Sequence, residues 1–265
     1  MEKIAIISDI HGNITALNTV LKDIKDRGIN RIFCLGDMLI KCSSPTECVE
    51  KVLSICEVVV MGNCEDRTVN TPRIDEHYWN QEQLTEEQKE KIKKLPLSYD
   101  FKMSGYNIRI MHASPYSNHQ KAYFWDFDDE FSNRMETMFD NTEFLNNLEA
   151  DKPDIVIFGH LHKPMIIRQK EKLLINPGAV SNTSDLVNIN GKDYTYGSYL
   201  ILEGEYGSEE IFEFSYKIVK FIYNHKEEAE RILKTDMPNK ESAYTEIYTG
   251  KYFDRKLLEK RLEGK

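Results

Sequence analysis

The sequence has no long hydrophobic run: nothing in it approaches the ~20 apolar residues that a helix needs to cross a bilayer. Near the start, the apolar residues 4–7 are followed at once by Ser8 and Asp9, so the hydrophobic segment of a signal peptide is also missing. We therefore expect a soluble protein that stays in the cytoplasm and has no membrane partner.

Cysteine is scarce. The sequence has five cysteines, an odd number, and no two of them form a C-x-x-C pair. This pattern argues against a disulfide framework and against a zinc ribbon, so reduced thiols are expected. Only Cys64 lies within one of the candidate ligand motifs.

Positive charge is also in short supply, because 35 Lys and Arg stand against 44 Asp and Glu, which gives a formal net charge of −9. A field of this sign repels the phosphates of nucleic acids at long range, so no stable binding of nucleic acid is expected. A small phosphorylated substrate remains compatible with the charge, because bound divalent cations would reverse its sign locally.

The chain shows no internal repeat, no low-complexity tract and no linker rich in Pro or Gly. With 265 residues, of which 40% are apolar, it is long enough to bury one sizeable core, and we expect a single domain over residues 1–265. Residues 225–265 are charged and weakly amphipathic. We interpret them as a helical C-terminal extension in which nothing suggests chemistry.

The first third of the sequence alternates between strand and helix patterns. Strands are expected at 3–8, 31–35 and 58–61, with a helix over 16–24 and a second one that opens at the capping-box pattern Ser44-Pro45-Thr46-Glu47. This order implies parallel strands joined by right-handed crossovers.

The remainder of the chain is less regular. A helix is expected over 84–95, and a hairpin joins 97–103 to 106–111. Further strands are expected at 154–158, around Ile166 and Leu174, and at 199–202 and 212–218. The aromatic stretch 123–131 could form a lid or a packed loop, and we favour the packed loop.

Four clusters of potential metal ligands come directly after predicted strands. They are Asp9-Ile10-His11-Gly12-Asn13, Gly36-Asp37, Gly62-Asn63-Cys64-Glu65, and His112 together with Gly159-His160-Leu161-His162. Each cluster alone has an ordinary structural explanation, such as a turn or a hydrogen-bonded histidine. Together they indicate a site at the C-terminal edge of the strands, where α/β proteins place their binding crevices. Carboxylate, imidazole and amide ligands suit divalent Mn, Fe, Zn, Co or Ni.

The blocks D-x-H-G-N, G-D, G-N-C-E, a single His and G-H-x-H, in this order from Asp9 to His162, resemble the metallophosphoesterase signature of the calcineurin-like superfamily. Asn176-Pro177-Gly178 is similar to the segment that follows in many members. Within the superfamily, the sequence looks most like small bacterial and archaeal phosphodiesterases and dinucleotide-polyphosphatase relatives.

The resemblance implies an α/β fold: a four-layer α/β/β/α sandwich with two mixed β-sheets and the metal site at the C-terminal edge of the strands. It also implies two divalent metal ions. Asp9, His11 and His162 would hold one ion, Asn63, His112 and His160 would hold the other, and Asp37 would bridge them.

Two metals about 3.5–4 Å apart can generate a bridging hydroxide at neutral pH for an in-line displacement on phosphorus. The implied function is therefore that of a phosphodiesterase or a nucleotide-polyphosphate hydrolase, with Asp37, Asn63 and His112 as catalytic residues. Two alternatives stay open: a catalytically weak metal-binding scaffold of the same fold, and a Ser/Thr protein phosphatase.

One position departs from the family pattern. Many members carry histidine after Gly-Asn, where it assists the leaving group, but this chain has Cys64. A thiol is a poorer proton donor, so we expect substrates with good leaving groups to be cleaved best, with His119 or Glu65 as candidate replacement acids.

Five residues are candidates for substrate binding: Asn13, Cys64, Arg67, Ser114 and His119. Four have a structural alternative. Asn13 could cap the helix that begins at residue 14, which we favour, and Ser114 could shape the turn around Pro115. Arg67 and His119 could be ordinary surface residues. Edge strands or the C-terminal region could also mediate a homodimer.

Overall fold

The computed structural model describes residues 1–120, 130–181 and 186–250. Within them it contains eight helices: α1 (Ile14–Asp26), α2 (Pro45–Ile55), α3 (Asn63–Val69), α4 (Asp75–Gln83), α5 (Glu86–Lys93), α6 (Phe131–Thr137), α7 (His225–Leu233) and α8 (Lys240–Thr249). None of the helices in these ranges is long and apolar enough to span a membrane.

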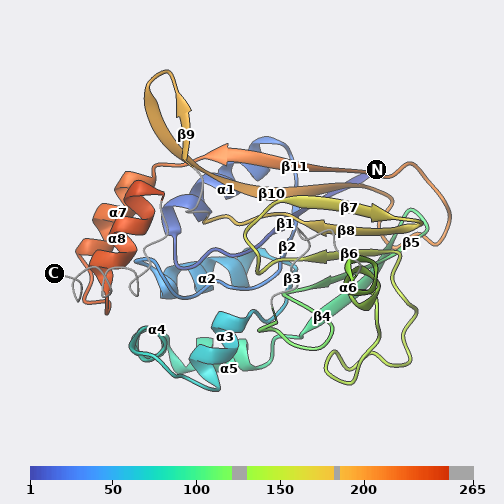
Figure 1. Cartoon of the computed structure of the whole chain (residues 1–265), viewed down its shortest axis with the longest axis horizontal. Coiled ribbons are helices and arrows are strands. Elements are labelled where there is room, and N and C mark those ends of the chain that lie inside the picture. Colours follow the sequence, from blue (N-terminus) through green and yellow to red (C-terminus); the bar gives the residue numbers. More distant parts are fainter. Residues whose placement is uncertain (121–129, 182–185, 251–265) are drawn as a thin grey trace.

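Eleven strands in the same ranges form two mixed sheets, which pack face to face and overlap in the view of Figure 1. The strands are β1 (Glu2–Ile7), β2 (Arg31–Cys34), β3 (Val58–Val59), β4 (Ser98–Met103), β5 (Tyr106–Met111), β6 (Ile155–Phe158), β7 (Met165–Gln169), β8 (Lys172–Asn176), β9 (Leu186–Ile189), β10 (Lys192–Gly204) and β11 (Ser215–Ile222). The first sheet has the order β11-β10-β1-β2-β3, with β9 paired to β10. The second has the order β4-β5-β6-β8-β7.

Three layers of apolar side chains hold the sheets and helices together. Between the two sheets, Ile4 and Ile6 of β1 pack in one cluster with Ile108 of β5 and Ile157 of β6. The alternate residues of β1 point to the opposite face, where Ile7 packs with side chains of α1 and α2. On the outer face of the second sheet, β6 contributes to a cluster that includes residues of α6. These layers confirm the expected four-layer sandwich, and the period of two along each strand accounts for them.

The βαβαβ unit is confirmed, because β1 pairs parallel with β2 and β2 pairs parallel with β3. Several details differ from the sequence prediction. Ser44 precedes α2 with Pro45 in the first turn, but its side chain makes no capping hydrogen bond, so the predicted capping box is wrong. A true capping box opens α5 instead, where Thr85 and Gln88 bond reciprocally.

Other elements were missed or misplaced by sequence patterns. Strand β10 runs over 13 residues rather than four, and β11 begins at Ser215, after the aromatic residues that had suggested its start. Helices α4 and α6 were not expected. The choice between lid and packed loop for residues 123–131 falls almost wholly outside the described residues.

Candidate metal centre

All seven predicted metal ligands follow strands of the two sheets and meet at one edge of the sandwich. Asp9 and His11 follow β1, Asp37 follows β2, and Asn63 opens α3 just after β3. The second sheet contributes the others, because His112 follows β5 while His160 and His162 follow β6. The loops after both sheets therefore build the site together.

Five of the seven ligands have a backbone conformation that L residues rarely adopt. The φ angles are positive at Asp9 (55°), His11 (54°), Asp37 (54°), His160 (66°) and His162 (59°). Each such residue costs on the order of 1–3 kcal/mol, and strain of this kind is concentrated at functional sites. Backbone hydrogen bonds hold the conformations in place, such as that from the His11 N–H to the Asp37 carbonyl at 2.9 Å.

Glycines let the ligand loops approach each other closely. A Cβ on Gly159 would overlap Ser8, and one on Gly62 would overlap the backbone nitrogen of Asp37. This close approach explains why both motifs contain glycine, since a side chain at either position would push the ligand loops apart.

Three overlapping ligand groups occur among the described residues, and Asp9, His11 and His162 form the first; another, His11, Asp37 and Cys64, links it to the group described next. The Nε2 atom of His162 lies 3.2 Å from Oδ1 of Asp9 and 3.0 Å from Nε2 of His11. The other oxygen of Asp9 accepts hydrogen bonds from Ser8 Oγ at 2.6 Å and from the His160 N–H at 3.1 Å. Burial opposes ionisation of Asp9, but His162, His112 and His11 hold its pKa well below the usual range.

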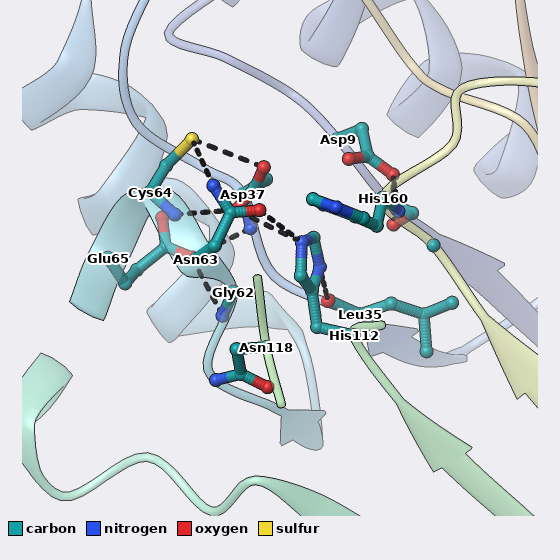
Figure 2. Close-up of polar contacts among 12 residues, drawn as sticks. Asp9, Leu35, Asp37, Gly62, Asn63, Cys64, Glu65, His112, Asn118 and His160 are labelled. Carbon is teal, nitrogen blue, oxygen red and sulfur yellow. Dashed lines mark hydrogen bonds and ion pairs between the residues drawn. The ribbon is translucent and has the colours of Figure 1, made fainter. Parts of the chain in front are cut away.

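Asp37, His112 and His160 form the second group. Nε2 of His112 lies 3.4 Å from Oδ1 of Asp37 and 3.0 Å from Oδ1 of Asn63. Figure 2 shows the ring of His160 between Asp9 and this group. The second oxygen of Asp37 lies 3.9 Å from Nε2 of His11, so Asp37 stands between the two groups.

The histidines are oriented to offer Nε2 to the site. Nδ1 of His11 lies 3.1 Å from the Leu39 carbonyl, and Nδ1 of His112 lies 2.8 Å from the Leu35 carbonyl. A carbonyl can only accept, so Nδ1 carries the hydrogen in both rings and Nε2 keeps its lone pair when the ring is neutral. Burial lowers the pKa of His11 to about 3 and that of His160 to about 4.

Two buried polar atoms of the site, both within the described residues, lack a hydrogen-bond partner, and a metal ion could serve as the partner of both. Oδ1 of Asp9 and Nε2 of His160 are both buried without a hydrogen-bond partner in that part of the chain. Buried polar atoms are normally satisfied, and leaving one unpaired costs about 1–3 kcal/mol. Carboxylate and neutral imidazole are the donors that divalent transition metals take, so the residues present fit such ions.

Glu65 was not predicted as part of the supporting framework. It is fully buried, and its two oxygens accept four backbone hydrogen bonds, from Asp37 and Gly62 at Oε2 and from Met38 and Leu39 at Oε1. Figure 2 shows it beneath Asp37. The suggestion that Glu65 replaces the missing acid is therefore wrong, because its carboxylate is bound by the backbone. The residue instead fixes the loop that carries Asp37.

Cys64 contacts Asp37 rather than open solvent. Its N–H donates to Oδ1 of Asp37 at 2.8 Å, and its thiol donates to Oδ2 at 3.2 Å. Burial, reinforced by the Asp37 charge, raises the pKa of the thiol. Cys64 thus remains a neutral donor that orients Asp37.

The other predicted substrate-binding residues divide into two kinds. Arg67 lies one helical turn beyond Asn63 on α3 and is partly exposed, and His119 is held next to α3 by Asp66 at 2.9 Å. Both therefore belong to the region of α3, the helix that Asn63 opens. Ser114, by contrast, is buried in the turn it shapes, where its hydroxyl bonds the Ser117 carbonyl.

Asn13 is the cap of α1, as favoured from the sequence. Its Oδ1 accepts from the Ala16 N–H at 2.9 Å, and its amide nitrogen donates to Ser181 and Tyr223. The side chain is fully buried and its polar atoms are engaged in these contacts. Asn13 therefore has a structural role, and its buried side chain offers no accessible surface to a substrate.

Comparison with known proteins adds a decisive observation, since the model of the calcineurin-like phosphoesterase superfamily domain matches residues 2–202. The chain belongs to this superfamily. An uncharacterized protein of Methanocaldococcus jannaschii is 30% identical over 245 residues, covering 89% of this chain and 93% of that protein. The superfamily and the His/Asp groups together support metal binding and phosphoester hydrolysis in general.

Two solved structures share the fold of this calcineurin-like chain. A metallophosphoesterase from Sphaerobacter thermophilus has a TM-score of 0.68 at 22% identity, covering 94% of this chain and 99% of that one. A hypothetical protein from Pyrococcus horikoshii has a TM-score of 0.70 at 15% identity, covering 95% and 98%. The coverage indicates that the common fold extends past residue 202 and includes much of the C-terminal region.

Proposed function

We propose that this chain is a dinuclear metal-dependent phosphoesterase that hydrolyses phosphodiesters or nucleotide polyphosphates. The observation that carries the proposal is the position of Asp37, whose two oxygens face His112 at 3.4 Å and His11 at 3.9 Å. One carboxylate between two ligand groups is the arrangement that a bridged pair of ions requires. Asp9, His11 and His162 would hold one ion, and Asn63, His112 and His160 the other.

Two bound divalent ions would supply an activated water and neutralise charge on the phosphoryl oxygens. The chain's own residues arrange the rest. Glu65 and Cys64 orient Asp37, and backbone carbonyls orient His11 and His112. Arg67, on the helix that Asn63 opens, is the candidate donor to a phosphoryl oxygen, for which a guanidinium is well suited.

His119 is the residue that would donate a proton to the leaving group. Glu65 is bound by backbone N–H groups and Cys64 by Asp37, whereas the side chain of His119 is 33% exposed and is oriented by Asp66. Because His119 stands beside α3 and not at the position after Asn63, acid assistance should be weak. Esters and anhydrides with good leaving groups are therefore the expected substrates.

The test combines metal analysis with hydrolysis. The purified protein should contain roughly two metal ions per chain and cleave bis(p-nitrophenyl) phosphate much faster than an alkyl monoester. Asp37→Asn should lower kcat by at least about 10³-fold, since a charged group in the reacting centre is lost. Asp26→Asn, at an exposed ion pair on α1, is the matched control and should keep full activity.

The outcomes separate the alternatives. Full activity in the Asp37→Asn protein would contradict the proposed centre. Metal-loaded protein that hydrolyses no ester or anhydride would favour a metal-binding scaffold. A phosphopeptide cleaved as fast as the activated diester would favour a protein phosphatase.

A further inference from the structure

The side chain of Cys64 faces the carboxylate of Asp37. Its sulfur lies 3.2 Å from Oδ2 of Asp37, and its backbone N–H donates to Oδ1 of the same residue at 2.8 Å. Figure 2 shows both contacts, with the sulfur directed at Asp37 from the first turn of α3. Two contacts to one carboxylate fix the direction of the Cys64 side chain, so the sulfur belongs to the metal centre and not to the outer surface of the helix.

His11, Asp37 and Cys64 together form one of the groups that could hold a metal ion. Their ligand atoms all lie within 4.8 Å of one another, and all three residues are buried. Ligands of one divalent ion, at bond lengths of ~2.0–2.3 Å, stand roughly 3–4 Å apart. The 3.2 Å from sulfur to Oδ2 of Asp37 and the 3.9 Å from that oxygen to Nε2 of His11 both fall in this range. Imidazole, carboxylate and sulfur are therefore spaced to share one ion.

A buried oxygen without a hydrogen-bond partner points to a cation at the same place. Oδ1 of Asp9 has no such partner among the described residues, and Asp9 is fully buried. This oxygen lies 3.9 Å from Nε2 of His11. Because Nδ1 of His11 contacts the Leu39 carbonyl, Nε2 keeps its lone pair for a metal. A cation at this nitrogen would satisfy Asp9 and contact the group that contains Cys64.

The other four cysteines are not placed in this way. Cys34, Cys42 and Cys48 are buried, and Cys56 is half-buried. In the part of the chain that the structure describes, Cys64 alone among the five belongs to a group of potential metal ligands. The remaining cysteines therefore serve as internal controls for any experiment on the Cys64 thiol.

A sulfur ligand changes which ions a site prefers. Thiolate is a soft ligand that favours Zn²⁺ and other thiophilic ions over Mn²⁺. The seven ligands predicted from the sequence are carboxylates, imidazoles and an amide, which accept Mn²⁺ as well as Zn²⁺. Sulfur at Cys64 is thus the one donor in this set of side chains that can separate the two kinds of ion.

Coordination by Cys64 needs only the loss of a proton. With its proton, the thiol is the donor to Asp37 described above. When the sulfur binds an ion, the S–H bond breaks, its electron pair stays on sulfur to form the bond to the metal, and the proton passes to the solvent. The step requires no oxidant or reductant. The S–H bond already faces Oδ2 of Asp37, so an ion that replaces the hydrogen meets both ligands.

We propose that Cys64 is a further metal ligand, which binds a thiophilic divalent ion together with His11 and Asp37 and makes the centre selective for Zn²⁺ over Mn²⁺. The ion would be one of the two that the proposed function requires, so this inference rests on that proposal.

Cobalt(II) is the probe for a bond between sulfur and metal in the full chain, after chelator treatment and reloading. A thiolate bound to Co²⁺ gives an intense charge-transfer absorption in the near ultraviolet, which oxygen and nitrogen ligands do not give. The wild type should show this band and Cys64→Ser should lack it. Cys56→Ser is the matched control and should keep the band. A band of wild-type intensity in Cys64→Ser, or none in the cobalt-loaded wild type, would overturn the proposal.

Metal selectivity is measured by competitive titration of Zn²⁺ and Mn²⁺. Serine keeps a donor to Asp37 and removes the sulfur, so the substitution isolates the ligand role. Cys64→Ser should weaken Zn²⁺ binding by at least about tenfold, the smallest loss expected even for a contact behind a ligand, and should change Mn²⁺ binding by less than about threefold. Equal weakening for both ions would show that Cys64 only orients Asp37, and this outcome would contradict a ligand role.

X-ray absorption of the zinc-loaded wild type needs no variant and therefore does not depend on how Cys64→Ser folds. It should show a sulfur ligand at ~2.3 Å from zinc. A shell of nitrogen and oxygen alone would overturn the proposal. None of these measurements depends on hydrolysis: a sulfur ligand in a protein that cleaves no ester refutes the proposed function and leaves Cys64 as a ligand, whereas an active enzyme without a sulfur ligand refutes only the role of Cys64.

Discussion

At the scale of single residues, Glu65 shows how one buried carboxylate can organise the loop that carries a candidate metal ligand, Asp37. Its oxygens receive four N–H groups from Asp37, Gly62, Met38 and Leu39. Burial and the neighbouring Asp37 raise the pKa of Glu65 to about 7, while the bonds from the Asp37 and Met38 N–H groups act in the opposite direction. The side chain of Glu65 therefore fixes the position of the backbone around Asp37.

We expect Glu65→Gln to lower the free energy of unfolding by roughly 3 kcal/mol, because an amide nitrogen would face backbone donors without an acceptor. Metal affinity should fall about 10- to 100-fold, as it does when a supporting contact of a ligand is lost. Urea denaturation and metal titration measure the two effects. Glu90→Gln, in an exposed ion pair on α5, should change stability by less than about 0.5 kcal/mol. Wild-type values for both quantities in Glu65→Gln would refute the role.

At the scale of elements, helix α7 packs against and hydrogen-bonds to the loops that carry the candidate metal ligands. It buries Ala229 and Ile232 against Cys42 of the loop after β2, in a cluster shared with Trp79 of α4. Glu228 is fully buried and bonds to the start of α1 and to the same loop. The helix thus supports the metal centre from a distance in sequence of about two hundred residues.

Glu228→Gln should lower the free energy of unfolding by about 2–3 kcal/mol, since a charged acceptor of four hydrogen bonds is replaced by a neutral amide. The amides of residues 37–44 should exchange with deuterium faster than in wild type. Glu227→Gln, at the exposed neighbouring position, is the control and should leave both measurements near wild type. Unchanged exchange in the loop would show that α7 does not support it.

At the scale of the whole molecule, the metal centre joins the two sheets, because each sheet supplies part of the ligand set. The buried carboxylates of Asp9 and Asp37 and the positive φ angles of five ligands cost free energy in the folded state. Bound cations would offset both costs, so metal binding should contribute to global stability.

Removing metal with a chelator should lower Tm by roughly 10 °C, because free metal at a thousandfold excess over Kd stabilises a protein by ~4 kcal/mol and each kcal/mol shifts Tm by a few degrees in a chain of this size. Differential scanning calorimetry with and without added Mn²⁺ measures the shift. The Asp37→Asn protein should show a much smaller difference between the two conditions. An equal Tm for apo and metal-loaded wild type would contradict a coupling between the site and the fold.

The sequence alone placed the candidate ligands at one edge of the sheets because they follow strands in short motifs, whereas their division between two ions came from the resemblance to a family. In a parallel unit such as β1-α1-β2, the residues after the strands must lie at one edge, so Asp9 and Asp37 could be placed together without coordinates. The capping role of Asn13 was equally local, since its partner Ala16 is three residues away. Periodicity also determined the buried face of α1 and both faces of β1.

Only the tertiary structure decided what depends on residues far apart in the chain. Glu65 lies two residues from a ligand, but three of its four partners are 26 to 28 residues earlier, and the partners of Glu228 are 185 and 213 residues away. Hydrogen bonds and ion pairs form wherever packing brings donors and acceptors together. Helix and strand propensities describe only local preferences, so they cannot predict contacts between residues this far apart in the chain.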